Sequence, residues 1–418
     1  SGQNPNTNYD VEIPVTLGSG VTTYQYRVKL VLDGKTYYSE KLVFHPNQTH
    51  CTPTVTLSTW FKRFKTVNLV SVTHTEPAGD PPYEDATSVV FNLDKGTNPI
   101  LTITGSEPSW HNLTYKVYID LNNDNDFDDN QELVGFQAPI ASHITPITLT
   151  IPSNYIVIGT NLRMRVIGFE GTSNYCNAEV GNIKDFTVYI KPTVVSIKAF
   201  MQGPYSGTQM SDNLRTTVPL LIPTLEPYTG LGYTHVNGGG ETCNANVFTI
   251  TGDNAIVDWV YVELRDKNNP TLVKHTRSAL IQRDGDIVDV DGISPLSFKL
   301  ANPDNYYVAI RHRNHLGFRT NVSIALSTTA ASLNFTNNSV ATFGTNALKQ
   351  ISTGVYGMYS GDANRDGEVN AFDLNAHWKV QNSQLGYLGA DFNLDGEVNA
   401  FDLNAHWKVN NSIVQQLD

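Results

Sequence analysis

The chain has 418 residues, of which 40% are hydrophobic and only 16% charged, and its formal net charge is −12. This length suggests three or four domains. The acidic balance argues against nucleic acid as a partner, because phosphate binding needs a basic face, and no apolar run is long enough to span a membrane. The composition, rich in Thr, Asn, Val and Tyr, is typical of a secreted or cell-surface all-β protein that binds divalent cations.

The first fifty residues read as strands. Partly alternating runs at 24–32 and 36–44 flank Asp33-Gly34, which is a strong hairpin signal. Fifty residues are too few for a seven-stranded sandwich, so we expect 1–50 to be a partial immunoglobulin- or fibronectin-like unit. No secretory signal opens the chain, and we therefore expect a processed protein or the last part of a longer one.

The second expected domain, 51–191, contains an acidic loop after a strand-like run that starts at Tyr115. Oxygen-bearing side chains recur there at every second position and then once more: Asp120, Asn122, Asp124, Asp126, Asp128 and Glu132. Oxygens at alternate positions of a tight loop converge on one centre, which is the arrangement that calcium requires. Asn125 replaces the usual glycine, and asparagine also tolerates the left-handed conformation. The alternative is an acidic hairpin tip.

The same region contains Cys51, the stretch 117–127 and the sequence GNIKDF at 181–186. These pieces resemble the GEVED domain of secreted Bacteroidota proteins. Asn182 and Lys184 replace two acids of that family's motif, and Asp185 remains. The resemblance implies a β-sandwich without established catalysis. Cys51 and Cys176 lie near the two ends of this domain, and in an oxidising compartment they form a disulfide candidate; two unconnected thiols are the alternative. Cys243 is expected to be an unpaired buried thiol.

The third expected domain, 192–360, is also β-rich. Its stretch 255–264 is long and largely apolar, as expected of a strand covered on both faces. The amino-acid sequences of its polar clusters at 283–292 and 311–317 resemble a module that occurs near the ends of large secreted Bacteroidota proteins.

These clusters raise the question of an active site. On a strand, His312 and His315 would point to opposite faces, and no catalytic motif accompanies them. We therefore expect Arg and His of the second cluster to pair with the Asp-rich turn of the first. A further calcium site at 284–291 is the alternative.

The last expected unit, 361–418, carries two near-copies of one loop-and-helix sequence, and the same fifteen letters follow from Asp366 and from Asp395. A calcium loop supplies ligands from positions 1, 3, 5, 7, 9 and 12 and has glycine at position 6, where Gly367 and Gly396 stand. The predicted ligands are Asp362, Asn364, Asp366, Glu368, Asn370 and Asp373, and then Asp391, Asn393, Asp395, Glu397, Asn399 and Asp402, with both Glu acting through their backbone carbonyls. Two copies in phase favour calcium sites over solvated acidic turns.

These residues resemble the duplicated calcium repeat of dockerin modules, which also have Asp at position 12. Cellulosomal dockerins choose a cohesin through loop positions 10 and 11, often a small hydroxyl pair. Here these positions hold Ala371-Phe372 and Ala400-Phe401. This departure argues against a cohesin partner, and a docking surface within the chain or on a neighbouring subunit is the alternative.

The expected fold class is mainly β, with tandem immunoglobulin-like β-sandwich domains followed by a small helical, EF-hand-like and dockerin-like calcium module. We expect calcium at two sites in 361–418 and at a third in 120–132. The expected function is a non-catalytic part of a secreted adhesin or extracellular appendage, with self-association, neighbouring subunits, glycans or a host or prey surface as partners. Ancillary modules of a secreted hydrolase, or a carbohydrate-binding module, are the alternatives.

Overall fold

The computed structural model describes residues 49–56, 64–77, 81–105, 112–129, 131–152 and 158–418, and the backbone of four short strands before them. These strands are β1 (Tyr24–Tyr26), β2 (Lys29–Leu32), β3 (Lys35–Tyr38) and β4 (Leu42–Phe44). Strands β2 and β3 pair antiparallel around Asp33-Gly34, so the predicted hairpin is confirmed, and β1 pairs with β4. Apart from residues 49 and 50, the rest of the expected unit 1–50 lies outside the described residues.

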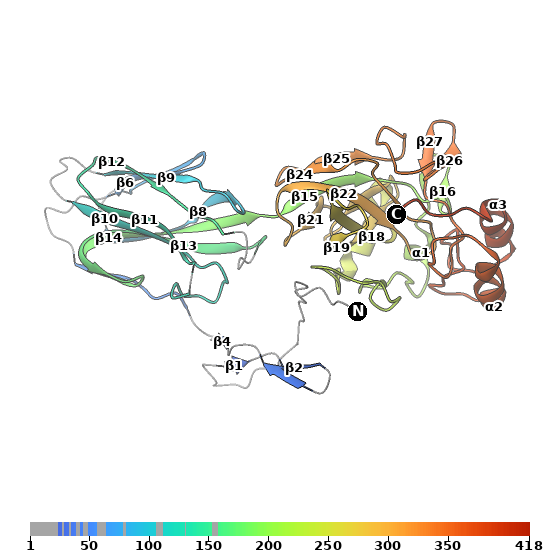
Figure 1. Ribbon diagram of the computed structural model, residues 1–418, viewed down its shortest axis with the longest axis horizontal. Helices are drawn as coiled ribbons and strands as arrows, with labels where there is room; N and C mark the ends of the chain where they lie inside the picture. Colours follow the sequence, from blue (N-terminus) through green and yellow to red (C-terminus); the bar gives the residue numbers. More distant parts are fainter. Residues whose placement is uncertain are drawn as a thin grey trace. The chain divides into compact units, whose positions relative to one another are not determined.

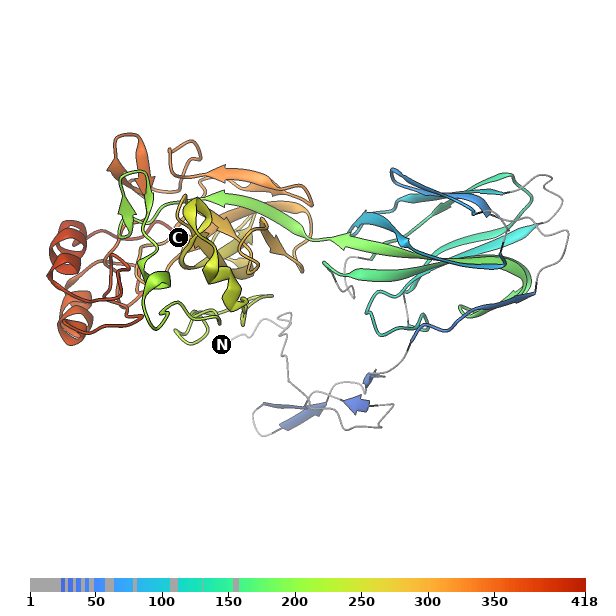
Figure 2. The same ribbon diagram turned by 180° about the vertical axis from the view of Figure 1, so that it is seen from behind.

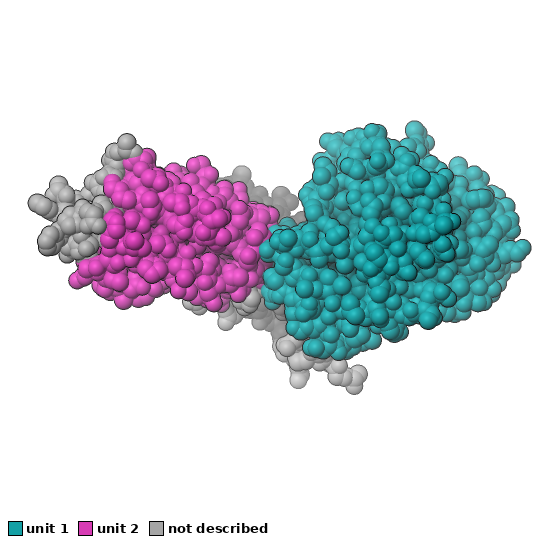
Figure 3. Space-filling model, turned by 90° about the horizontal axis from the view of Figure 1, so that it is seen from above, with its two compact units in different colours: residues 1–11, 192–418 teal, residues 12–191 magenta. Residues whose placement is uncertain are grey.

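The chain divides into two compact units, coloured separately in Figure 3. Unit 2 is Glu12–Lys191, and unit 1 is Pro192–Asp418 together with Ser1–Val11. Unit 1 therefore contains both the third expected domain and the terminal calcium repeats. Among the described residues, no helix is both long and apolar enough to cross a membrane.

Besides the two-stranded pairs β1–β4 and β2–β3, unit 2 contains a six-stranded and a four-stranded β-sheet (Figure 1). The six-stranded sheet comprises β5 (Thr54–Thr56), β8 (Tyr83–Asp94), β10 (Leu113–Ile119), β11 (Leu133–Ile140), β13 (Asn161–Ser173) and β14 (Asn177–Lys191). The four-stranded sheet comprises β6 (Phe64–Leu69), β7 (Val72–Thr75), β9 (Ile100–Gly105) and β12 (Ile144–Thr148). Strand β14 is central: it pairs antiparallel with β13 and parallel with both β5 and β8.

One apolar core fills the space between these two sheets. Phe186, Val188 and Ile190 alternate along β14, and they share a cluster with Leu101 and Ile103 of β9 in the other sheet. Side chains at every second position of a strand point to the same face, so this alternation places one face of each sheet in the core. The result is the β-sandwich that the sequence predicts.

In unit 1, nine strands form one sheet around a second core. They are β15 (Thr193–Lys198), β18 (Ile256–Asp266), β19 (Val273–Gln282), β20 (Asp286–Val288), β21 (Leu296–Phe298), β22 (Asp304–Arg311), β23 (Phe318–Arg319), β24 (Ile324–Leu326) and β25 (Ala331–Asn334). Strand β18 lies between β19 and β22, and its residues 256–265 are all buried, as predicted for a strand covered on both faces. A hydrogen bond from the backbone N–H of Val194 to the carbonyl of Ser327 joins the β15 and β24 ends, so the sheet curls on itself. We call 192–360 the β domain.

Shorter elements border this sheet. They are the hairpins β16 (Tyr205–Ser206)–β17 (Gln209–Met210) and β26 (Lys349–Ser352)–β27 (Val355–Gly357), the helix α1 (Asn213–Thr216) and the 3-10 turns η1 (Ala245–Thr249) and η2 (Gly252–Asn254).

Two short helices end the chain, and Figure 2 shows them side by side. Each begins as a π-helical turn and ends as an α-helical one: η3 (Asp373–Trp378) with α2 (Lys379–Gln381), and η4 (Asp402–Trp407) with α3 (Lys408–Asn410). Their indole groups cross over reciprocally, since Trp378 Nε1 donates to the carbonyl of Asn399 (3.0 Å) and Trp407 Nε1 to that of Asn370 (2.8 Å). Each tryptophan therefore ties its own helix to the loop of the other repeat.

Candidate calcium loops and their surroundings

The two ends of the first terminal loop are held together by buried carboxylates. Asp362, 4% exposed, accepts a hydrogen bond through Oδ2 from the N–H of Gly367 (3.1 Å). Asp373, fully buried, accepts from the N–H groups of Asn364 (3.1 Å) and Asn370 (2.8 Å). Gly367 has φ +90°, a conformation that favours glycine. Positions 1 and 12 therefore lie on the inside of one closed loop.

The second terminal loop has the same construction. The two oxygens of Asp391 accept from the N–H groups of Asp395 (3.1 Å) and Gly396 (2.9 Å). Asp402 accepts from Phe392 (2.7 Å) and Asn399 (2.9 Å). Asp391 and Asp402 are both fully buried. Their burial leaves the loop interior as the place where a cation would meet both charges.

The remaining predicted ligands divide into three groups. At positions 3 and 5, the amide of Asn364 donates to Asp366 (2.7 Å) and the amide of Asn393 to Asp395 (2.7 Å), so these side chains lie together. The side chains of Glu368 and Glu397 at position 7 are exposed, which fits ligation through their backbone carbonyls. At position 9, the side-chain oxygens of Asn370 and Asn399 accept from the N–H groups of Phe372 and Phe401 (2.7 Å each). The asparagines thus hold the start of each helix.

Electrostatics of the loops favour a bound cation. Burial and neighbouring carboxylates raise the pKa of Asp362 and of Asp391 to about 7 and that of Asp402 to about 6. Asp362 Oδ1 is buried and has no hydrogen-bond partner in the part of the chain that the structure describes. A divalent cation would satisfy this oxygen and favour the charged carboxylates. All-oxygen ligands of this kind suit calcium.

Some metal sites are built only from His, Cys, Asp and Glu side chains. Across the described ranges, no group of three or more such side chains is placed to hold a metal ion. In the terminal loops the carboxylates instead accept backbone N–H groups, and amide and carbonyl oxygens make up the rest of the predicted ligand set. The fit to calcium therefore rests on the loop pattern and on the buried carboxylates.

The second repeat contacts the β domain through the segment that follows β22. Asn314 Nδ2 donates to the carbonyl of Asp391 (2.6 Å), and Arg313 Nη1 donates to the carbonyl of Leu388 (2.5 Å). Further along, Arg265 Nη1 and Arg319 Nε both donate to the carbonyl of Leu417 (3.0 and 2.6 Å). The four donating side chains are at least 95% buried. The terminal repeats are thus packed on the β domain of their own chain.

The two histidines of this segment are not where we expected them. Strand β22 ends at Arg311, so His312 and His315 lie in a loop, and their rings contact each other at 4.9 Å between centroids. The prediction that they point to opposite faces is wrong because it assumed a continuing strand. The expected pairing with the Asp-rich turn is also wrong: His312 Nε2 (3.2 Å) and Arg313 Nε (2.9 Å) both lie at Asp258 of β18.

Asp258 is the centre of this buried cluster. It also accepts a hydrogen bond from the Tyr387 hydroxyl (2.5 Å), which comes from the segment between the two repeats. Burial alone would raise the pKa of Asp258, but Arg313 and the hydrogen bonds from His312 and Tyr387 lower it to about 2. Burial lowers the pKa of both His312 and His315. A charged Asp258 with neutral histidines beside an arginine forms a structural junction.

The four aspartates of the Asp-rich turn are distributed among separate partners. Asp284 and Asp286 pair with Lys198 (2.9 and 3.1 Å), whereas Asp289 pairs with Arg277 (2.6 Å). Asp291 accepts hydrogen bonds from its own turn. This arrangement gives no support to a calcium site at 284–291.

The acidic loop of unit 2 repeats the hydrogen-bond pattern of the terminal loops. The two oxygens of Asp120 accept from the N–H groups of Asp124 (3.2 Å) and Asn125 (3.0 Å), which are positions 5 and 6. Asp391 receives the same pair of bonds in the second terminal loop. Asn125 has φ +74°, so it takes the left-handed conformation predicted for the missing glycine. The position-3 residue, Asn122, donates to Asp124 (3.0 Å), as its terminal counterparts do.

The same loop is closed by Glu132 from the start of β11. Its Oε1 accepts from the N–H of Leu121 at position 2 (2.8 Å), just as Asp402 accepts from position 2 of its own loop. Glu132 is 1% exposed, and its Oε2 has no hydrogen-bond partner among the described residues. Burial and the nearby carboxylates raise its pKa to about 8. The sequence did not point to His50, whose Nε2 lies 2.9 Å from Asp120.

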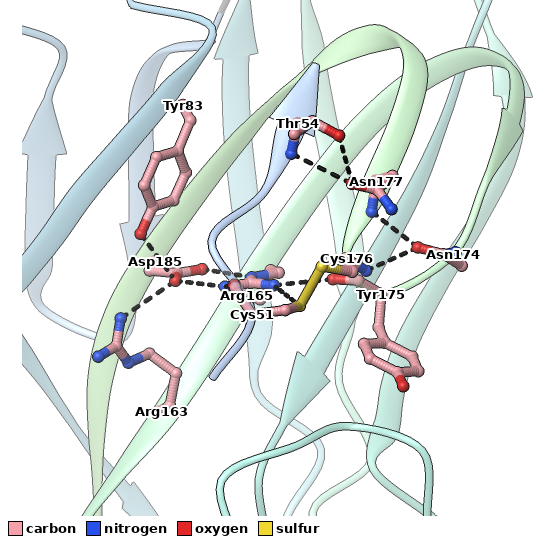
Figure 4. The surroundings of a disulfide bond; sticks show 10 residues. All are labelled: Cys51, Thr54, Tyr83, Arg163, Arg165, Asn174, Tyr175, Cys176, Asn177 and Asp185. Carbon is pink, nitrogen blue, oxygen red and sulfur yellow. Dashed lines mark hydrogen bonds and ion pairs between the residues drawn. A yellow bond between two sulfur atoms is a disulfide. The ribbon is translucent and has the colours of Figure 1, made fainter. Parts of the chain in front are cut away.

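Cys51 and Cys176 form a disulfide with their Cα atoms 5.9 Å apart (Figure 4). Beside it, Arg165 donates two hydrogen bonds to Asp185 (2.7 Å each) and one to the carbonyl of Cys51 (2.9 Å). Arg163 also contacts Asp185. Asp185, the acid that remains of the family motif, is therefore the centre of a buried structural cluster, and sequence reasoning missed both arginines.

Asn182 and Lys184, which replace two acids of that motif, are buried too. Lys184 forms ion pairs with Glu76 and Glu84, and the amide of Asn182 donates to the carbonyls of residues 81 and 82. Elsewhere, Cys243 is buried and its burial raises the thiol pKa, which disfavours the reactive thiolate.

Comparison with known families assigns two segments of the chain. Residues 114–189 match the family model of the GEVED domain, and residues 360–405 match that of the type I dockerin domain. The dockerin match supports calcium as the cation and suggests a protein partner of cohesin type. No curated protein matches the chain. Unit 2 thus contains the segment that matches the GEVED domain, and unit 1 contains the segment that matches the type I dockerin domain, packed on the β domain.

Proposed function

We propose that this chain is a non-catalytic, calcium-stabilised part of a secreted adhesin or extracellular appendage. The observation that carries the proposal is the pair of terminal loops: in each, the carboxylates at positions 1 and 12 are buried, and the pKa of the position-1 carboxyl is raised to about 7. The polar residues that most resemble an active site, His312 and His315, are at most 2% exposed and belong to the junction with the second repeat. In this proposal, bound calcium stabilises the folded state and takes no part in a reaction.

Three calcium sites are part of this proposal. Two are the terminal loops, and the third is the loop closed by Glu132. Its support is the match in hydrogen-bond pattern with the second terminal loop and the unpartnered, buried Oε2 of Glu132. An isolated buried carboxylate oxygen is costly, and a cation would remove that cost.

The partner surface that we propose lies on the two terminal helices. Phe372 and Phe401 at position 11 are each 57% exposed, and Val380 and Val409 are 63% and 56% exposed. Both repeats thus present the same apolar residues while their other sides are packed. An apolar surface of this kind suits protein contact. We propose self-association or a neighbouring domain as its partner; a cohesin-type partner would use the same residues.

The decisive experiment is thermal unfolding, with particle size, in millimolar calcium and in chelator. Asp366→Ala combined with Asp395→Ala should abolish the calcium-dependent rise in Tm of unit 1, because both loops lose a ligand at position 5. The matched control is Glu368→Ala with Glu397→Ala, which removes the same charge from exposed side chains that ligate only through their backbone.

The control should keep the calcium response. Equal melting in calcium and in chelator for the unmodified protein would contradict calcium stabilisation. Formation of a defined larger species in calcium would support the appendage assignment, and a monomer in both conditions would contradict self-association. Turnover of glycans or peptides by the purified chain would overturn the non-catalytic assignment.

A further inference from the structure

The two terminal repeats are identical over fifteen residues from position 5 onward but differ at positions 2 and 4. The first loop has Ala363 and Arg365 there, and the second has Phe392 and Leu394. Position 4 has the same left-handed backbone in both loops, with φ +67° and +59°. The two loops therefore have the same backbone conformation at position 4 but different side chains at positions 2 and 4.

The difference corresponds to contact with the β domain. Leu394 is fully buried and belongs to the core cluster of the β domain, whereas Phe392 is buried together with Ala363 in the small core of the terminal repeats. Arg365 is partly exposed. At Gly203 of the β domain, a Cβ would lie 1.7 Å from the carbonyl oxygen of Phe392, so only glycine permits this approach. The second loop is therefore the one that fits into the β domain.

Polar contacts reach the first ligand residue of that loop. Asn314, fully buried, donates to the main-chain carbonyl of Asp391, whose side chain is the position-1 ligand. Arg313 fixes the carbonyl of Leu388 three residues earlier. Each loop is also held in the same way by the end of the other repeat. The N–H groups of Ser412 and Gln415 donate to the carbonyls of Val369 and Gly367 (2.7 and 2.8 Å), and those of Ser383 and Gly386 donate to the carbonyls of Val398 and Gly396 (2.7 and 2.9 Å). The side-chain contacts from Asn314 and Arg313 are therefore additional to this shared support.

We propose that the β domain is a positioning part of the second calcium site, so that the second loop binds calcium more tightly than the first and calcium at that loop fastens the terminal repeats to the β domain. The proposal rests on the calcium binding proposed above. A loop already held in its ligating shape loses less conformational freedom on binding, and residues outside the ligand shell that orient ligands commonly change metal affinity about 10- to 100-fold. Coupling is reciprocal, so calcium at this loop must also strengthen the packing. The first loop is then the weaker, exchanging site.

Calcium titration calorimetry on the whole chain tests this proposal with two variants that make the same substitution in identical sequence surroundings. Asp366→Ala should remove the weaker of the two terminal sites, and Asp395→Ala the tighter one. Asn314→Ala should weaken the tighter site about tenfold, as expected for loss of one buried hydrogen bond, and leave the weaker site unchanged.

Hydrogen exchange supplies a second readout that is independent of affinity. In calcium, Asp395→Ala should increase exchange in 312–318 and in β22, whereas Asp366→Ala should leave these segments protected. Equal affinities of the two terminal sites, or a tighter first site, would overturn the proposal, as would Asn314→Ala weakening both sites alike. Absence of calcium binding at both loops would instead refute the proposed function on which it depends.

Discussion

Two buried carboxylates, Asp185 in unit 2 and Asp258 in unit 1, are each held by an arginine and by a tyrosine hydroxyl. In sequence, Asp185 resembles a functional residue because it is a family motif acid, whereas Asp258 lies beside a histidine only in the structure. In the structure their hydrogen bonds connect segments far apart in the chain. A buried ion pair adds little net stability compared with an apolar pair, but loss of one partner leaves an uncompensated charge.

Asp185→Asn should therefore destabilise unit 2 by about 3–5 kcal/mol, because Arg165 would remain buried without its carboxylate. Asp85→Asn is the matched control: the side chain of Asp85 is 54% exposed and lies 4.0 Å from Arg163, and its loss should cost below about 1 kcal/mol. Urea unfolding measures both differences. Similar values for the two variants would show that Asp185 is not a structural centre.

At this scale the sequence showed local loop contacts better than long-range partners. The alternating oxygens singled out Asp120 and Glu132, and the structure places both on one closed loop, because the contacts of such a loop are local in sequence. The partners of Asp185 are 20 and 22 residues away on the neighbouring strand. A usable signal was present nonetheless: Arg163 and Arg165 interrupt an otherwise apolar strand, and an arginine in such a place needs a buried acid.

Among the elements, the terminal loops show what spacing can and cannot predict. The two calcium loops and their helices follow directly from the repeat. Their attachment to the β domain does not, because it depends on where β22 ends and on which loop face the β domain covers. The available signal was position 4, where the first repeat has the partly exposed Arg365 and the second has the buried Leu394.

The loops also predict how pH and calcium act together. Without calcium, burial raises the pKa of Asp362 and Asp391 to about 7, well above their values in the unfolded chain. The folded state then holds protons that the unfolded state has released, so in chelator these groups reduce stability as pH rises from about 4 to 7. Bound calcium stabilises the charged forms and removes this loss.

The difference in Tm between calcium and chelator should therefore grow between pH 5 and pH 8, by about 5 °C or more for a unit of this size. The buried histidines have lowered pKa values, so they destabilise the fold as pH falls below about 6.5. Their effect on Tm is the same in calcium and in chelator, and it cancels when the two Tm values are subtracted. Differential scanning fluorimetry across this range is the measurement. A calcium effect that is constant with pH would contradict the raised carboxylate pKa values.

For the whole molecule, the sequence indicated a mainly β chain with a helical end, and the structure has this composition. Composition and turn signals report such a class because they are summed over many residues. They do not report that 192–360 and 361–418 share one compact unit, since that depends on contacts between residues far apart, such as Arg265 with Leu417.

Each unit has its own apolar core, one centred on β14 and the other on β18. Units with separate cores unfold as separate cooperative transitions. With the calcium loops proposed for each unit, both transitions should respond to calcium, but each through its own ligands. Glu132→Gln should lower the calcium-dependent shift of the unit 2 transition alone, and Asp395→Ala that of the unit 1 transition alone.

Calorimetric scans of the two variants in calcium and in chelator measure this directly. Gln keeps the size of Glu132 and can still accept the hydrogen bond from Leu121, so the fold of the acidic loop is retained while its charge is lost. A unit 2 transition with no calcium response in the unmodified chain would exclude the third site and leave the terminal loops unaffected. A loss of both shifts in either single variant would mean that the two units unfold together.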